Sequence, residues 1–306
     1  MNTRTTPLGP SSLTIVAIGV TILAWASAFI VIRGTGPYFS GGALALGRLL
    51  VGTVLLGIVV LIGRKWVAPH RREWLQIIGF GVLWFGAYNV ALNTAEHTLD
   101  AGTTAMIVNI GPILIALGAG VFLREGIPKW LAIGAGVAFL GVVLIGFSTG
   151  TSQLGDGTGV ILALVAAVTY AAGVLLQKPA LTRLPNAQVT WLGCAIGMVA
   201  CLPFAGDLVR DFADAPPQGI LGMLYLGAIP TALAFSTWAY ALSRMPAGQL
   251  GVSTYIVPPL AIVMGVLVFH EVPAVLAVVG GAVCLVGVAL SRRRARVPEP
   301  AEYVAE

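Results

Sequence analysis

The sequence predicts an all-α polytopic membrane protein with ten transmembrane helices, arranged as two inverted five-helix repeats around a central cavity. Three observations predict this fold: an apolar composition, ten apolar stretches of membrane-spanning length, and an internal repeat. Hydrophobic residues make up 58% of the 306 residues and charged residues only 9%, whereas a soluble domain is about a quarter charged. The chain therefore has too little charge to cover a water-facing surface.

This composition argues against a soluble enzyme, a disulfide-built secreted domain and a disordered protein. The 39 glycines and 18 prolines fit membrane helices, in which both residues are more frequent than in soluble helices. The net charge of +5 is spread over short loops, so no basic stripe predicts a nucleic-acid partner. Cys194, Cys201 and Cys284 lie in apolar runs without metal-ligand spacing. We expect no disulfide, no metal and no other cofactor.

Ten apolar stretches are long enough to cross a hydrocarbon core of ~30 Å as helices. In chain order they cover residues 12–32, 40–62, 73–91, 99–123, 129–147, 157–178, 187–206, 217–241, 248–269 and 272–290. Turn residues mark the connections Gly34–Pro37, Gly63–Arg72, Ser148–Gly157, Pro185–Asn186 and Ala215–Pro217. The first stretch lacks a small-residue cleavage site and leads directly into the second, so we interpret it as a retained helix and not a signal peptide.

The loop charges predict the orientation. Fourteen Lys and Arg residues fall in the loops and termini of one side, whereas only Arg33 and Arg210 fall on the other. Cytoplasmic loops carry the excess of Lys and Arg. We therefore expect a multi-pass protein of the plasma membrane (the bacterial inner membrane) with both termini in the cytoplasm.

An internal repeat divides the chain into residues 1–150 and 151–291, followed by a basic and then acidic cytoplasmic tail at 292–306. Asn109 and Pro112 recur as Tyr255 and Pro258 at a shift of 146. Five spans is an odd number, so the second half must enter the membrane from the opposite side. Inverted repeats are typical of transporters, because two mirror-related packings give inward-open and outward-open states around one site. The repeat therefore predicts alternating access.

The chain resembles a known family at several motifs. The segment Ala24–Phe29 reads AWASAF, and Pro112, Glu125 and Pro128 mark the end of the fourth stretch. These features resemble the EamA type of the drug/metabolite transporter (DMT) superfamily over roughly residues 12–290, and the chain is similar to aromatic amino-acid exporters of that superfamily. The resemblance implies a central cavity between spans 1, 3, 4, 6, 8 and 9, with spans 2, 5, 7 and 10 outside it or closing it.

Acidic side chains are expected only in or beside loops, at Glu96, Asp100, Glu125, Asp156, Asp207 and Glu271. Small multidrug members of the superfamily exchange protons through a membrane-embedded Glu. Because the sequence predicts no such residue here, we expect transport that does not need a proton gradient.

Arg48 is the single charge clearly within a predicted span, about 12 Å along the second stretch at 1.5 Å per residue. One interpretation is a group that binds a substrate carboxylate at the edge of the cavity. The alternative is a structural Arg that donates to backbone carbonyls or extends to the outer surface. A single Arg is too little for phosphorylated sugars, which favour several fixed cations.

Aromatic and amide side chains supply the other candidates for substrate binding. Trp25, Trp84 and Tyr170 are 11 to 13 residues into their stretches, too deep for an interfacial belt. The full set of substrate-binding candidates is Arg48 with Trp25, Trp84, Tyr88, Asn89, Asn109, Tyr170, Trp238 and Tyr255. Asn109 and Tyr255 each precede a proline by three residues, and proline frees a backbone carbonyl one turn earlier. Packing in the core is the alternative for each ring.

These patterns favour a secondary transporter that exports small organic metabolites, above all amino acids with aromatic or bulky apolar side chains. Another neutral metabolite or a drug-like compound is the alternative substrate. A channel or a membrane-embedded enzyme is the alternative class, although no nucleophile–base pair or metal cluster predicts catalytic residues. The expected partners are a small-molecule substrate and membrane lipids, with no obligate protein partner.

Overall fold

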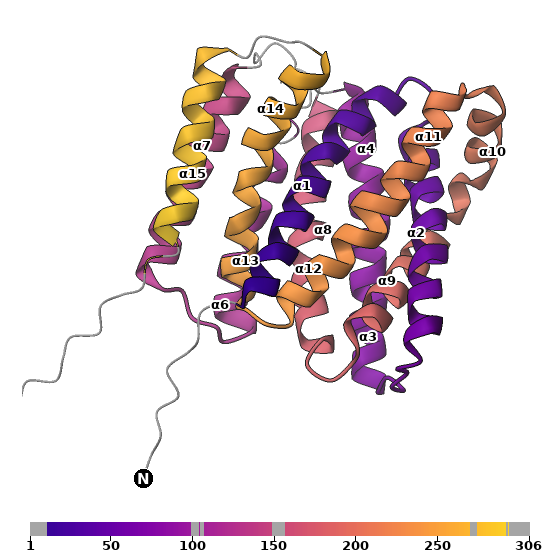
Figure 1. The fold of residues 1–306 in the computed structure, drawn as a ribbon, viewed down its shortest axis with the longest axis horizontal. Helices are drawn as coiled ribbons and strands as arrows, with labels where there is room; N and C mark the ends of the chain where they lie inside the picture. The colour runs from indigo at the N-terminus through magenta and orange to yellow at the C-terminus, as the bar shows by residue number, and fades with distance from the viewer. Residues whose placement is uncertain are drawn as a thin grey trace, which may run out of the picture.

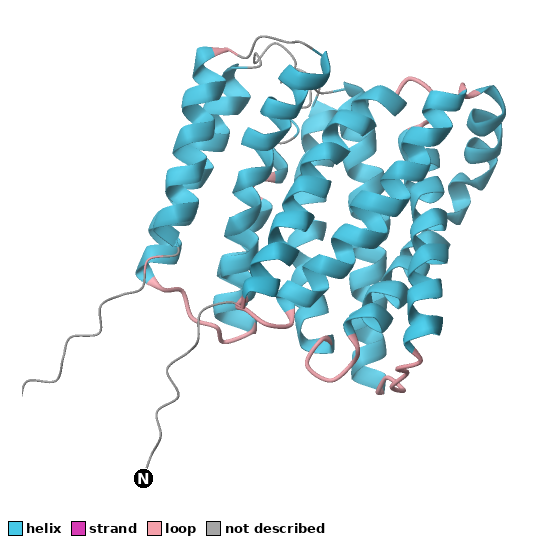
Figure 2. Ribbon diagram, viewed as in Figure 1, coloured by secondary structure: helices cyan, strands magenta, loops and turns pink. Residues whose placement is uncertain are grey.

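The structure, a computed structural model, describes residues 11–98, 104, 107–148, 157–269, 274–291 and 293. Every regular element within these residues is a helix (Figures 1 and 2). The first part contains α1 (Ser12–Thr35), α2 (Gly41–Gly63), α3 (Arg71–Phe80), η1 (Gly81–Ala87), α4 (Tyr88–Thr98), α6 (Gly111–Phe122) and α7 (Lys129–Ser148). The second contains α8 (Gly157–Ala180), α9 (Asn186–Ala200), η2 (Leu202–Phe204), α10 (Ala205–Asp214), α11 (Pro217–Leu226), η3 (Gly227–Leu233), α12 (Ala234–Leu242), α13 (Ala247–Ser253), η4 (Thr254–Ile256), α14 (Val257–Phe269) and α15 (Val275–Ser291).

Six continuous helices in the described residues are long and apolar enough to cross a membrane. They are Ser12–Thr35, Gly41–Gly63, Arg71–His97, Gly157–Ala180, Pro217–Leu242 and Ala247–Val268. The pair Asn186–Ala200 and Leu202–Asp214 forms a seventh if it is counted as one span bent by 52°, and Gly111–Phe122, Lys129–Leu144 and Val278–Ser291 are shorter apolar helices. Large apolar side chains on the outside, such as Leu61 and Ile62, each 76% exposed, suit contact with lipid. The chain is a polytopic helical membrane protein.

Two predicted stretches end differently in the structure. The third was predicted to end at residue 91 but continues as α4 to Thr98. Its polar side chains can lie inside the protein because they are hydrogen-bonded there: Asn93 Nδ2 donates to the carbonyl of Gly41 at 3.2 Å. The seventh, predicted to run to residue 206, stops at Ala200. Pro203 follows within η2, and because proline has no backbone N–H to donate, the chain turns there into α10.

Two π-helical segments, η1 and η3, interrupt the third and eighth predicted spans, and they begin at Gly81 and Gly227, 146 positions apart. Polar side chains donate hydrogen bonds to backbone carbonyls in or beside these two segments. Asn89 Nδ2 donates to the carbonyl of Phe85 at 2.8 Å, and Thr231 Oγ1 donates to that of Leu226 at 2.8 Å. Such segments occur frequently at functional sites, and both of these adjoin the cavity described below.

Several side chains contact positions 145 or 146 residues away. Tyr255 OH donates to the carbonyl of Asn109 at 3.0 Å, 146 positions away. Cys284 and Ala138, also 146 apart, are joined by a 3.3 Å bond from Sγ to the carbonyl oxygen. At the level of whole helices, α2 packs on α9, α6 on α13 and α7 on α15; α7 and α15 stand together at the left of Figure 1. The contacts of Tyr255 and Cys284, and the pairs α2–α9 and α7–α15, join parts of the chain that lie about 146 positions apart.

Close packing of α7 against α15 depends on Gly141. A Cβ added there would lie 2.5 Å from the backbone nitrogen of Cys284, and backbone cannot move aside as a flexible side chain can. We therefore expect Gly141→Ala to lower the free energy of unfolding by about 1–3 kcal/mol, measured by thermal melting in detergent. Gly136→Ala is the matched control in the same helix, since its Cβ would meet nothing within 4 Å. Equal melting of the two variants would contradict the expectation.

Candidate functional site

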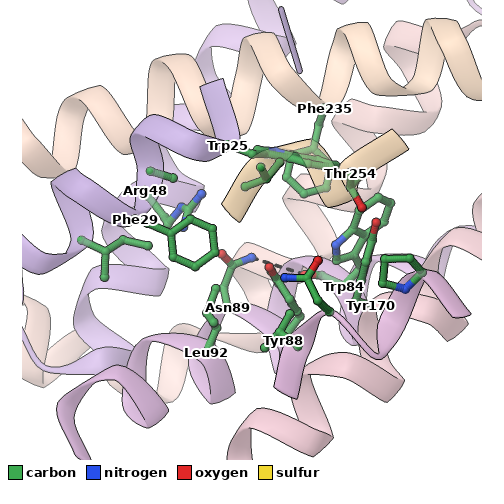
Figure 3. A pocket seen from close by; sticks show the side chains of 16 residues that line it. Trp25, Phe29, Arg48, Trp84, Tyr88, Asn89, Leu92, Tyr170, Phe235 and Thr254 are labelled. Atoms are coloured by element: carbon green, nitrogen blue, oxygen red, sulfur yellow. Dashed lines mark hydrogen bonds between the residues drawn. The ribbon is translucent and has the colours of Figure 1, made fainter. Parts of the chain in front are cut away.

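A cavity in the middle of the bundle holds about 690 Å³ of empty space, part of it open to the outside. Its walls are formed by Trp25, Ala28, Phe29, Ile32, Arg48, Trp84, Tyr88, Asn89, Leu92, Val108, Asn109, Pro112, Tyr170, Phe235, Thr254 and Val257 (Figure 3). These residues come from α1, α2, η1, α4, residues 108–112, α8, α12, η4 and α14.

Packed aromatic rings form much of the wall. The ring centroid of Trp84 lies 4.8 Å from that of Phe235, 5.1 Å from that of Tyr170 and 6.1 Å from that of Trp25. The contacts of Trp84 with Phe235 and Trp25 are edge-to-face, an arrangement that aromatic pairs prefer, and its contact with Tyr170 is tilted. Trp25 is further held by its Nε1, which donates to the carbonyl of Pro230 in η3 at 3.3 Å. The rings therefore offer a large apolar surface whose orientation the protein has already set.

Among the described residues that line the cavity, Arg48 alone is charged. It is only 4% exposed, and its Nε donates to Thr231 Oγ1 at 3.1 Å. Because the Thr231 hydroxyl gives its own proton to the carbonyl of Leu226, its oxygen is free to accept from the guanidinium. The place of Arg48 at the cavity argues against a lipid-facing Arg, and its hydrogen bond to Thr231 fits a structural role as well as the binding of a carboxylate. The structure positions a fixed cation beside Phe29 (Figure 3).

Seven of the nine predicted binding residues lie in the cavity wall: Trp25, Arg48, Trp84, Tyr88, Asn89, Asn109 and Tyr170. The other two lie behind it. Trp238 is 1% exposed and packs against Trp25 with ring centroids 5.0 Å apart. Tyr255 has no exposed surface, and its hydroxyl donates a hydrogen bond to the carbonyl of Asn109. Their rings support the wall from outside the cavity.

Sequence reasoning missed two aromatic wall residues, Phe29 and Phe235. Phe29 follows Trp25 by four positions and Phe235 precedes Trp238 by three, and both spacings place side chains on one helix face. That spacing was a usable signal. In helices that are apolar on every side, however, it does not say which face is turned inward.

Glu96 lies near a helix end, as expected for the acidic residues, but its carboxyl group is not exposed there. It lies within α4, and its carboxyl oxygen Oε1 is buried. Its burial was not foreseen because the predicted span ended at residue 91, before the polar turn that packs against α2. Asp100, Asp156 and Glu271 lie outside the described residues. Within the described ranges, no three His, Cys, Asp or Glu side chains gather into a group that could hold a metal ion.

Comparison with known proteins gives a consistent result. The profile of the EamA-like transporter family matches residues 12–147 and 157–293. A protein described as a probable terminal-alkyne amino-acid exporter of Streptantibioticus cattleyicolor is 35% identical over 279 residues, which cover 91% of this chain and 93% of that protein. The uncharacterised transporter YdfC of Bacillus subtilis is 31% identical over 86% of each chain.

Two further comparisons are more distant. A probable amino-acid metabolite efflux pump of Salmonella typhimurium is 23% identical over 90% of this chain and 95% of its own length. One solved crystal structure superposes with a TM-score of 0.75 over 92% of this chain and 99% of its own, at 19% identity. At that identity the likeness concerns the fold alone.

Proposed function

Because this chain belongs to the EamA-like transporter family of the DMT superfamily, we propose that it is a secondary transporter that exports amino acids with aromatic or bulky apolar side chains by alternating access. The observation that carries the proposal is the cavity wall, in which one fixed cation, Arg48, faces a set of aromatic rings. The relative described as an exporter of terminal-alkyne amino acids supports an amino acid as substrate. Another neutral metabolite or a drug-like compound is the alternative.

The recognition of such a substrate follows from the chemistry of the wall. We propose that the carboxylate binds Arg48, whose planar guanidinium matches carboxylate geometry. The side chain of the amino acid then stacks among Trp25, Trp84 and Phe235, while the amide of Asn109 supplies a polar contact. Tyr88, Asn89 and Tyr170 complete the proposed binding set, and Trp238 and Tyr255 hold it in place from behind. A single lining cation disfavours phosphorylated substrates.

Alternating access is supported by the contacts between the two halves. We propose ten spans, in which the bent pair α9–α10 and the shorter apolar helices α6, α7 and α15 join the six long ones. The halves 1–150 and 151–291 are proposed as inverted repeats. On a twofold axis corresponding elements meet each other, as the pairs α2–α9 and α7–α15 do. The matching positions of η1 and η3 also support the repeat.

The proposed site of action is the bacterial inner membrane, with both termini and the 292–306 tail in the cytoplasm. The unequal distribution of Lys and Arg between the two sides supports this orientation. Membrane lipids and a small-molecule substrate are the proposed partners.

Counterflow in reconstituted vesicles tests the function. Vesicles preloaded with unlabelled L-phenylalanine are expected to take up labelled L-phenylalanine faster than unloaded vesicles, and the uptake should saturate. In an alternating-access carrier, the binding site must return to the outside before it can take up another labelled molecule. If the empty carrier makes this return slowly, substrate inside the vesicle speeds the return and therefore the uptake. Glucose 6-phosphate serves as the negative substrate. Flux without stimulation by internal substrate would indicate a channel and would contradict alternating access; no phenylalanine flux at all would contradict the substrate class.

A further inference from the structure

The cavity lies toward one end of the helix bundle. Its wall on α1 consists of Trp25, Ala28, Phe29 and Ile32, all in the second half of that helix. Helix α2 runs back from the same end and contributes Arg48 from its first half. In the proposed orientation, in which the chain starts in the cytoplasm, this is the outer end of the bundle. The cavity therefore lies nearer to the outer surface than to the cytoplasm.

Helices of the first half have counterparts of matching length in the second. Helices α1 and α8 each contain 24 residues, and α8 begins 145 positions after α1. Helices α3 and α11 each contain 10 residues, and α11 begins 146 positions after α3. Since η1 and η3 follow them at the same shift of 146, α4 corresponds to α12. The proposed repeat therefore assigns a counterpart to each wall residue on α1 and α4.

Three residues of the cavity wall have counterparts that are buried at the opposite, inner end of the bundle. The counterparts are at most 1% exposed, and none is among the described residues that line the cavity. The corresponding pairs are Phe29 with Val174, Ile32 with Gln177, and Leu92 with Trp238. Equivalent positions therefore line a cavity at one end of the bundle and pack closely at the other.

Two kinds of contact hold the inner end closed. Lys178 Nζ donates to the carbonyls of Leu242 at 2.5 Å and Met245 at 2.7 Å, which joins the end of α8 to the end of α12 and the residues after it. Gly173 allows η1 to approach α8 closely, since a Cβ added to it would lie 2.5 Å from the Cβ of Trp84. Separation of α8 from α12 and η1 would uncover the three buried counterparts.

Two fully buried glutamines differ in their hydrogen bonds. Gln188 Oε1 accepts from the backbone nitrogen of Val67 at 3.0 Å, and its Nε2 donates to the Val67 carbonyl at 2.7 Å. In Gln177, Nε2 and Oε1 are both buried and no described residue bonds either of them, and the same holds for Nε1 of Trp238. Unpaired buried polar groups are unfavourable. The closed inner end therefore costs free energy that an open one, in which these groups are paired, would not.

We propose that Val174, Gln177 and Trp238 line the cavity when it opens to the cytoplasm, and that the Gln177 amide binds the amino-acid substrate there. This inference rests on the proposed function. Inverted repeats exchange their conformations between the two access states, so the counterparts of the outer wall become the inner wall. The amide can donate to the substrate carboxylate and accept from its ammonium group. Its outer counterpart is the apolar Ile32, so this contact belongs to the cytoplasmic side alone.

Replacement of the buried amide tests the substrate contact. Gln177→Leu should keep or raise the melting temperature in detergent, because Leu removes two unpaired polar atoms at similar volume. It should also increase, by about tenfold, the ratio of the KM for L-phenylalanine at the cytoplasmic face to that at the outer face. The two values come from inside-out and right-side-out vesicles of cells that express the full chain. Gln188→Leu is the matched control, which should melt lower and leave the ratio unchanged.

Thiol labelling tests the inner wall without altering the amide. A membrane-impermeant thiol reagent should modify Val174→Cys from the cytoplasmic face only and Ile32→Cys from the outer face only. Val168→Cys, on α8 at a position that is 56% exposed on the outside of the bundle, should react from neither face because lipid covers it. The native protein, whose three cysteines are buried, gives the background.

The outcomes separate this inference from the proposed function. A lower melting temperature of Gln177→Leu with an unchanged KM ratio would overturn the substrate contact. Absence of labelling of Val174→Cys in vesicles that transport phenylalanine would overturn the inner wall. Both results leave the proposed function intact. Absence of phenylalanine transport by the native protein would instead overturn the proposed function and the substrate contact with it.

Discussion

Replacing Arg48 with Gln is expected to weaken the binding of L-phenylalanine by about 10- to 150-fold while the protein stays folded. Hydrogen bonds to a charged group contribute about 1.5–3 kcal/mol, and each 1.4 kcal/mol changes affinity about tenfold. Gln keeps a polar group that can bond Thr231, the present partner of Arg48 at 3.1 Å, so the loss should fall on the ligand. Calorimetry on purified protein, with melting temperature recorded alongside, measures both effects.

A ligand without a carboxylate provides the control for this prediction. Phenylalaninamide should bind native protein and Arg48→Gln with similar affinity, because it has no carboxylate for the guanidinium to hold. Arg210→Gln changes an Arg in α10 whose side chain is 76% exposed, and it should leave phenylalanine binding unchanged. If Arg48→Gln melts normally and binds phenylalanine as the native protein does, Arg48 has only a structural role.

Replacing Trp84 with Ala is expected to lower the free energy of unfolding by about 3–5 kcal/mol, the usual cost of deleting a buried Trp. Trp84 is 1% exposed, and its ring contacts those of Trp25, Phe80, Tyr170, Phe235 and Trp238 at centroid separations of 4.8–6.1 Å. Its removal leaves a cavity that several rings border at once. Thermal melting in detergent should show a large decrease and expression should decline.

Trp25→Ala separates packing from recognition. Trp25 is only half-buried and lies at the cavity, so its loss should mainly remove a stacking contact of about 0.5–1.5 kcal/mol. Phenylalanine affinity should then decrease by about 2- to 13-fold, with a much smaller change in melting than in Trp84→Ala. Equal destabilisation by the two variants would place Trp25 in the packed core, and normal melting with unchanged affinity would remove it from the site.

Family membership was predictable from the sequence and is confirmed by the match over residues 12–147 and 157–293. The motifs responsible, such as Ala24–Phe29 and the Pro112–Pro128 region, are contiguous or nearly so, and they require no knowledge of packing. The helical membrane fold was predictable for a related reason. In lipid, each backbone group must be bonded within its own segment, so an apolar stretch of sufficient length forms a helix whatever its neighbours are.

The sequence by itself determined that the chain is a polytopic helical membrane protein and that Trp25, Trp84 and Tyr170 lie deep within their helices, since depth depends only on position along an apolar stretch. Only the tertiary structure decided which faces of the helices meet. It placed Phe29 and Phe235 at the cavity and Tyr255 behind it. It also buried the Oε1 atom of Glu96, a residue that the sequence placed in or beside a loop. The physical reason is that a helix with apolar residues on every side has no sequence pattern that identifies its inward face. Contacts between segments far apart in the chain determine which face is turned inward.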